Sequence, residues 1–105
     1  MSLPVAEFSE PKEVTDMLRA KSALEEYAIS MELIRECFPE RRGLEIYLQD
    51  DPDEAGITCV ILEVVLPESM PFEVLNERRD MYYTERRRRL PALQWPICGL
   101  SVDFA

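Results

Sequence analysis

Carboxylates are the side chains in this sequence best suited to acid–base chemistry, because the 105 residues include no histidine. Glu25 and Glu26 are adjacent, whereas Glu63 interrupts an apolar segment and Asp103 alternates with apolar residues near the chain end. Two close carboxylates can share a proton and act as acid and base. Neither pair is accompanied by a nucleophile, a phosphate-binding loop or an oxyanion hole. We therefore interpret Glu63 and Asp103 as polar residues on an apolar sheet face, and we predict no enzymatic activity.

An acidic segment, residues 50–56 (DDPDEAG), has the composition of a cation site. A calcium loop that began at Asp51 would need an oxygen ligand at its fifth place and a bidentate glutamate at its twelfth. Those places hold Ala55 and Leu62. The segment is more typical of a solvated turn between two strands, so we predict no metal there.

The three cysteines, Cys37, Cys59 and Cys98, are far apart and odd in number, so neither a disulfide framework nor a CxxC motif is indicated. Each has apolar neighbours, which is typical of reduced thiols in a cytoplasmic protein. A metal site with three thiolates is the alternative, and it would require three distant segments to converge. The sequence has no Walker motif, GxGxxG, GxSxG or HExxH. We predict no cofactor.

The composition is that of a soluble globular protein. Hydrophobic residues make up 47% and charged residues 31% of the sequence, and the formal net charge is −9. This balance supports a folded core, and the length suits a single domain over residues 1–105. The longest apolar segment, residues 57–66, is too short to span a membrane as a helix, and no signal peptide is recognisable. The sequence thus predicts a cytoplasmic protein without membrane contact.

Half of the twelve basic residues are arginines clustered in one short segment. They are Arg78, Arg79, Arg86, Arg87, Arg88 and Arg89. Tyr82 and Tyr83 lie between them, and arginines interleaved with aromatic residues are typical of nucleic-acid binding. The end of a solvated helix is a simpler interpretation, because cations there interact favourably with the helix dipole. We rank the solvated helix end first, a docking patch for an acidic protein second and nucleic acid third, since the net charge of −9 repels polyanions.

Residues 11–38 have the periodicity of a helix with one apolar stripe. The stripe consists of Met17, Ala20, Leu24, Tyr27, Met31, Ile34 and Phe38. Ser22 and Glu25 match a capping box, so the region is either one helix or two helices over about 11–20 and 22–37. In both cases we expect the stripe to lie against a sheet.

Three further segments have the patterns of strands. Residues 44–49 and 97–104 alternate between apolar and polar positions, and residues 57–66 are rich in β-branched side chains and apolar on both faces. A second helix is predicted over residues 70–88, between the second and third strands. Its expected inner face consists of Phe72, Leu75, Met81 and Tyr82.

These elements predict a two-layer α+β fold. We expect a three-stranded sheet in the order 1-2-3, with the middle strand 57–66 central and with helices over about 11–38 and 70–88 on one face. A right-handed crossover would make the third strand parallel to the middle one. The uncovered face would then expose an apolar patch, and such patches mark interfaces, so we predict a homodimer. The expected interface residues are Tyr47, Ile57, Cys59, Ile61, Val65 and Ile97.

The order of elements and three sequence stretches resemble a group of small, uncharacterised bacterial α+β proteins with a helix, a β-hairpin, a helix and a final strand. The stretches are Leu44–Val65, with LEI and VILEV, Phe72–Tyr83, which reads FEVLNERRDMYY, and Leu100–Phe104, which ends in VDF. The resemblance implies the same fold, and it implies no activity or site residues. The arginine run departs from the less basic loop expected in this group.

Small size, an uncovered apolar sheet face and the lack of catalytic motifs favour a non-enzymatic protein-interaction module, such as the accessory component of a bacterial gene pair. The expected partner is a second copy of the chain or another protein. A regulator that binds nucleic acid through residues 78–89 is the first alternative. A small enzyme that uses carboxylates such as Glu63 and Asp103 is the second.

Overall fold

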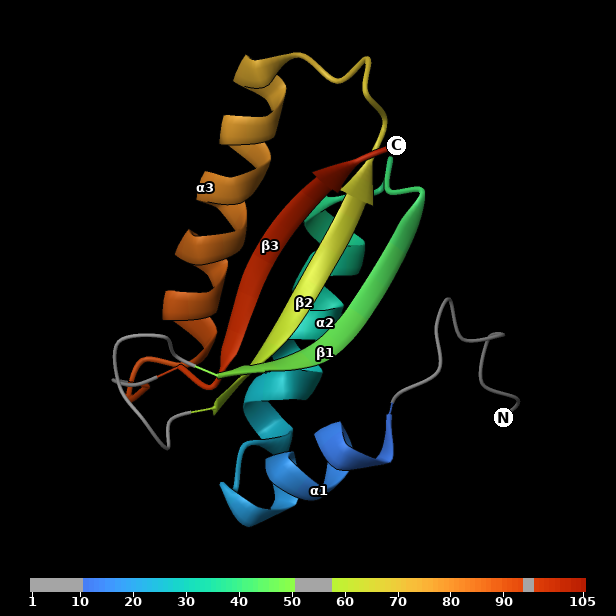
Figure 1. Cartoon of the computed structure of the whole chain (residues 1–105). Coiled ribbons are helices and arrows are strands. Elements are labelled where there is room, and N and C mark those ends of the chain that lie inside the picture. Colours follow the sequence, from blue (N-terminus) through green and yellow to red (C-terminus); the bar gives the residue numbers. More distant parts are fainter. Residues whose placement is uncertain (1–10, 51–57, 94–95) are drawn as a thin grey trace, which may run out of the picture.

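The computed structural model describes residues 11–50, 58–93 and 96–105, and within these ranges the chain forms three helices and a three-stranded sheet (Figure 1). In chain order the elements are α1 (Lys12–Ala20), α2 (Leu24–Cys37), β1 (Gly43–Asp50), β2 (Thr58–Leu66), α3 (Phe72–Arg89) and β3 (Cys98–Phe104). The fold is α+β, as the sequence predicts.

The central strand β2 separates a covered sheet face from an open one. β1 pairs with β2 in antiparallel orientation and β3 pairs with it in parallel, which confirms the predicted order. Side chains alternate between the two faces along a strand. On β2, Val60, Leu62 and Val64 are fully buried, whereas the intervening Ile61 and Glu63 are half-buried. The helices therefore cover one face and leave the other open.

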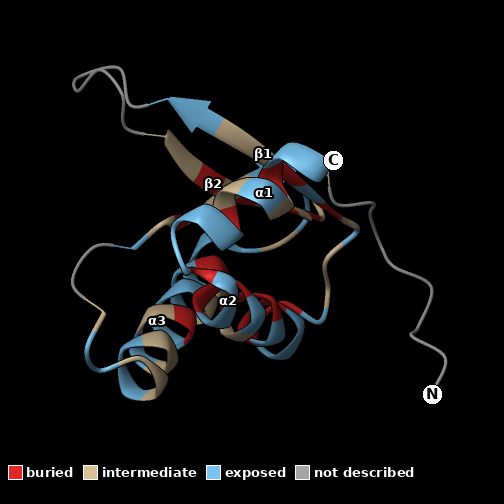
Figure 2. Ribbon diagram, turned by 90° about the horizontal axis from the view of Figure 1, so that it is seen from below, coloured by how far each residue is buried: buried red, intermediate tan, exposed pale blue. Residues whose placement is uncertain are grey.

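α2 is the main helix of the covered face. It lies behind the sheet in Figure 1, with α3 to the β3 side of it and α1 at the lower end. Figure 2 shows buried positions between the sheet and α2, and where α3 meets α2. The predicted stripe is confirmed from Tyr27 through Met31 and Ile34 to Phe38, all of which belong to the core. Each such side chain contributes roughly 1.5–3 kcal/mol on burial, so this stripe is a principal attachment of the helices to the sheet.

The chain changes direction between α1 and α2, so residues 11–38 form two helices. Ser22 adopts a left-handed conformation, with a φ of 54°. The N–H of Ala23 donates to the C=O of Leu18 at 2.8 Å, and the N–H of Ser22 donates to the C=O of Arg19 at 3.2 Å. These two bonds form the Schellman motif that ends many helices.

The predicted capping box at Ser22 is wrong, because Ser22 ends α1 and does not begin α2. Ala23 is the N-cap of α2, and it makes no capping bond through its side chain. The turn also shifts the buried face of the chain. As a result Leu24 is 47% exposed, and α1 buries Val14 and Leu18 outside the predicted stripe.

α3 is attached through a narrow apolar stripe. Leu75 and Tyr82 are its buried residues. Phe72 is 69% exposed and Met81 is 40% exposed, so the prediction that they line the inner face is wrong. α3 packs mainly against α2 at the border of the helix layer, so only the side marked by Leu75 and Tyr82, seven positions apart, faces the core. None of the helices in the described ranges is both long enough and apolar enough to cross a membrane.

Replacing Ser22 by glycine should stabilise the protein, because glycine adopts positive φ without a steric penalty. We expect Ser22→Gly to raise the free energy of unfolding by about 1 kcal/mol. The matched control Ala28→Gly, at an exposed position within α2, should lower it by about 1 kcal/mol. Urea unfolding followed by far-ultraviolet circular dichroism measures both. A loss of stability in Ser22→Gly would contradict the left-handed helix end.

Candidate functional site

Glu26 places a carboxylate inside the fold, where it accepts hydrogen bonds from the start of β3. The residue is only 5% exposed. Its Oε2 accepts the N–H of Ile97 at 2.8 Å and the N–H of Cys98 at 2.7 Å. Glu26 also lies in the first turn of α2, where the helix dipole stabilises negative charge. The carboxylate thus joins β3 to α2, although Glu26 and Ile97 are 71 positions apart in the sequence.

Arg86 fastens the same point of β3 to α3. Its Nη1 donates to the C=O of Cys98 at 3.0 Å. Its guanidinium carbon lies 5.6 Å from the ring centroid of Tyr82 and 5.3 Å from that of Tyr83, within the range of cation–π attraction. The N–H and the C=O of Cys98 are therefore both bonded by side chains from helices. Glu26 and Arg86 together satisfy backbone groups at the start of a strand that, among the described strands, pairs with β2 alone.

Burial around this junction raises the pKa of its weakly acidic side chains. Desolvation, with a further contribution from Glu26, raises the pKa of the Cys98 thiol to about 12. Burial also raises the pKa of Tyr82, although the Ser30 hydroxyl and Arg86 oppose that shift. Both groups stay protonated at neutral pH, so neither supplies a nucleophile or a base.

Sequence reasoning named Glu26 as a neighbour of Glu25 but missed its buried structural role, although a signal was present. Glu26 begins a second series in α2 with Ser30, Leu33 and Cys37, and all four residues are buried. Their 4-3-4 spacing places them on one side of the helix, next to the stripe that the sequence did reveal. A glutamate on so wide a buried face must have hydrogen-bond partners.

Most arginines of α3 are engaged within the chain. The ion pairs are Arg78–Glu40 at 2.6 Å, Arg88–Glu85 at 2.8 Å, Arg89–Glu36 at 2.9 Å, Arg89–Glu32 at 3.4 Å and Arg89–Glu85 at 3.5 Å. Arg86 and Arg89 are half-buried, so the predicted solvated helix end is only partly exposed, and Arg78 is half-buried as well. Arg79 and Arg87 are exposed, and within the described ranges they form no ion pair.

Glu63 lies on the open sheet face, bonded from both neighbouring strands. Its Oε1 accepts the hydroxyl of Tyr47 in β1 at 2.9 Å and, less closely, that of Ser101 in β3 at 3.4 Å. Burial and the bond to Glu63 raise the pKa of Tyr47, so its hydroxyl remains a donor. Asp103 lies opposite Val65, so the predicted pair of Glu63 and Asp103 is not a direct cross-strand pair.

The open face also carries most of the residues predicted for a dimer interface. Those on it are the half-buried Tyr47, Cys59, Ile61 and Val65. Ile57 lies outside the described residues. Ile97 instead packs against the core beside Glu26, because its N–H is bonded to that carboxylate. The apolar part of the open face is therefore centred on β2.

No metal site is assembled in the described part of the chain. There, no three histidine, cysteine, aspartate or glutamate side chains lie close enough to hold an ion. Cys37 and Cys98 are buried and Cys59 is half-buried, all as free thiols. Of the acidic segment 50–56, only Asp50 is described, and its Oδ1 accepts the hydroxyl of Thr58 at 2.8 Å.

Comparison with known proteins gives no relative: no family model, no curated protein and no solved structure matches this chain. The resemblance to small bacterial α+β proteins therefore stays a prediction. A function for the chain has to rest on the geometry of the open face and of the junction at Glu26 and Arg86.

Removing Arg86 should destabilise the fold far more than removing its neighbour. We expect Arg86→Ala to lower the free energy of unfolding by about 2 kcal/mol, because it loses a charged hydrogen bond and contacts with two aromatic rings. The control Arg87→Ala, at an exposed position, should change it by less than about 0.5 kcal/mol. Denaturant unfolding measures the stability of both variants. Equal changes in the free energy of unfolding would contradict the role of Arg86.

The three thiols should differ in reactivity. In the folded protein at neutral pH, N-ethylmaleimide should modify Cys59 first, because Cys98 is buried with a pKa of about 12 and burial also raises the pKa of Cys37. Peptide mass spectrometry reads out the order of labelling. Unfolding in urea should make all three reactive. Labelling of Cys98 as fast as Cys59 in the folded protein would contradict the buried start of β3.

Proposed function

We propose that this chain is a non-enzymatic protein-interaction module that binds its partner through the open face of the sheet. The observation that carries the proposal is a face with half-buried Tyr47, Ile61 and Val65 that no helix of the described chain covers. Apolar surface of this kind is favourable for binding, because docking removes it from water. Binding the second product of a bacterial gene pair is one such role.

The charges on the face specify the chemistry of the partner. Glu45, Glu63 and Asp103 lie among the apolar residues, and no strand residue described on this face is basic. A complementary surface presents an apolar patch flanked by lysine or arginine side chains. Complementary charges accelerate encounter and exclude wrong partners more than they raise affinity.

The same charges work against a second copy as the occupant. Stacking two open faces would bring two sets of acidic residues together in chains that each carry a net charge of −9. The homodimer thus stays a prediction, and it is the competing outcome of the experiment below.

The two alternative functions, nucleic-acid binding through the arginines of α3 and catalysis by Glu63, are less well supported. Arg78, Arg88 and Arg89 already pair with carboxylates of the chain, and Arg86 is bonded to a backbone carbonyl. A nucleic-acid site needs several free cations to replace counterions on phosphates. For an enzyme, Glu63 is the best-placed carboxylate on the face, and it already accepts hydroxyls from both sides.

Photo-cross-linking in the source cells tests the proposal. A photoreactive residue at position 61 should capture a distinct protein, whereas the same residue at Asn76, exposed on α3, should not. The captured partner is then purified and its Kd measured. We expect Ile61→Asp to weaken binding at least about tenfold and Glu45→Lys to weaken it and flatten its salt dependence. The control Arg79→Glu should stay within about twofold.

Two results would overturn the proposal. Capture from position 76 but not from 61, or loss of binding in Arg79→Glu with Ile61→Asp unaffected, would move the interface to α3. A cross-linked dimer formed through position 61 would make a second copy the occupant and contradict the charge argument. Circular dichroism of Ile61→Asp confirms that any loss of binding is not a loss of fold.

A further inference from the structure

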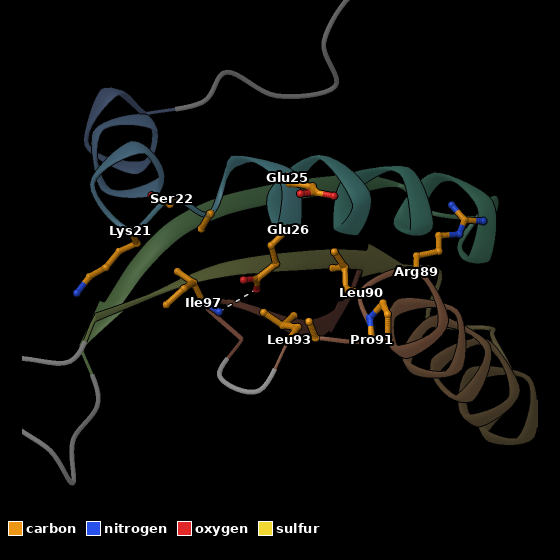
Figure 3. Close-up of a pocket in the computed structure, with 11 residues that line it drawn as sticks. Lys21, Ser22, Glu25, Glu26, Arg89, Leu90, Pro91, Leu93 and Ile97 are labelled. Atoms are coloured by element: carbon orange, nitrogen blue, oxygen red, sulfur yellow. Dashed lines mark hydrogen bonds between the residues drawn. The ribbon is translucent and has the colours of Figure 1, made fainter.

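A pocket of about 480 Å³ lies where the α1–α2 turn, the end of α3 and the segment before β3 meet (Figure 3). Its size falls within the range of small-molecule sites. The wall is mainly apolar, formed by Ala23, Leu90, Pro91, Ala92, Leu93 and Ile97. The pocket is distinct from the open sheet face, and none of the roles described above uses it as a binding site.

Glu26 brings a buried carboxylate to this apolar pocket. Its Oε2 is occupied by the N–H groups of Ile97 and Cys98. No backbone N–H or hydroxyl group of the described chain donates to its Oε1, and the further donor near this carboxylate is the Cys98 thiol, which donates only weakly. Since Glu26 lines the pocket, this oxygen is left to accept a hydrogen bond from a pocket ligand.

The other charged side chains at the pocket do not neutralise this carboxylate. In Figure 3 the charged ends of Lys21 and Arg89 point away from Glu26 toward opposite ends of the site. Arg89 is already bound to Glu36, and Glu25 directs its carboxylate along α2 away from Ile97. The start of α2 contributes about half a positive charge, which is less than the full negative charge of a carboxylate.

From this combination we propose that the pocket binds a small organic cation, with a primary ammonium group on Glu26 Oε1 and an aliphatic or aromatic body against Leu90, Leu93 and Ile97. An ammonium donates a charge-assisted hydrogen bond to a carboxylate, and this bond is strengthened where water is excluded. The apolar wall gains from covering the body of the ligand. An anion of the same shape is repelled, and a neutral alcohol forms the weaker, uncharged bond.

Three compounds of one shape and different charge test the assignment: 2-phenylethylamine, 2-phenylethanol and 3-phenylpropionate. Each is titrated into ¹⁵N-labelled protein while amide resonances are followed. The amine should shift the resonances of Ile97, Cys98 and Glu26 with saturation at a Kd of about 1 mM, as expected for a ligand of so few atoms. The alcohol should bind at least about tenfold more weakly, and the anion should give no saturable shift.

Two variants test whether the amine binds at Glu26. Glu26→Gln keeps a carbonyl oxygen for the N–H groups of β3 but removes the charge, so it should weaken amine binding about tenfold or more. The control Glu68→Gln removes an exposed charge outside the pocket and should stay within about twofold. If Glu26→Gln does not fold, Leu93→Arg serves in its place, because it puts a competing cation in the pocket wall and should abolish binding.

The proposal fails if the amine gives no saturable shift up to about 10 mM, where a ligand of this size should approach saturation. It also fails if the alcohol binds as tightly as the amine, or if the shifts centre on Glu45 and Asp103 of the open face. Unchanged amine binding in Glu26→Gln, or in Leu93→Arg, would equally overturn it.

Discussion

The carboxylate of Glu26 is the interaction on which the arrangement of this fold depends. In the described sheet β3 is an edge strand that pairs with β2, and its buried first backbone groups require partners other than water. Glu26 provides them by accepting the N–H groups of Ile97 and Cys98, and Arg86 completes the set at the carbonyl of Cys98. Two helices and a strand from distant parts of the sequence are thus joined at one residue. Because the charge is buried, loss of either partner would leave an uncompensated polar group.

This junction explains why the basic residues of α3 do not form the binding patch that their clustering suggests. Arg86 is committed to β3, and Arg78 and Arg89 join α3 to glutamates in or just after α2. Individually such half-exposed ion pairs contribute little, but they set the rotation of α3 against α2. Because the three described helices lie on one side of the sheet, the opposite side is the surface left for a partner. Its acidic and apolar side chains come from three strands, so its character depends on the register that the junction fixes.

The sequence predicts what depends on local periodicity. Alternation and the apolar run of residues 57–66 predict the sheet order with β2 central, and the stripe from Tyr27 to Phe38 predicts the buried side of α2. Prediction from the sequence fails where a pattern has two local interpretations. Ser22 fits a helix start as well as a helix end, and only the backbone conformation distinguishes them. The sequence also misleads where distant neighbours decide burial: Phe72 is apolar but is 69% exposed, and Glu26 is charged but is buried and bonded by β3.

Hydrogen exchange of the backbone amides measures the central role of Glu26 most directly. In Glu26→Ala the amides of residues 97–104 should lose about tenfold to a hundredfold of their protection, as expected for one charged hydrogen-bond acceptor, while the paired amides of β1 and β2 stay more protected than β3. Glu25→Ala, which removes the exposed neighbouring charge, should leave the pattern unchanged. Protection that falls equally in all three strands, or that does not change in β3, would contradict a junction at Glu26 that holds β3 to the helices.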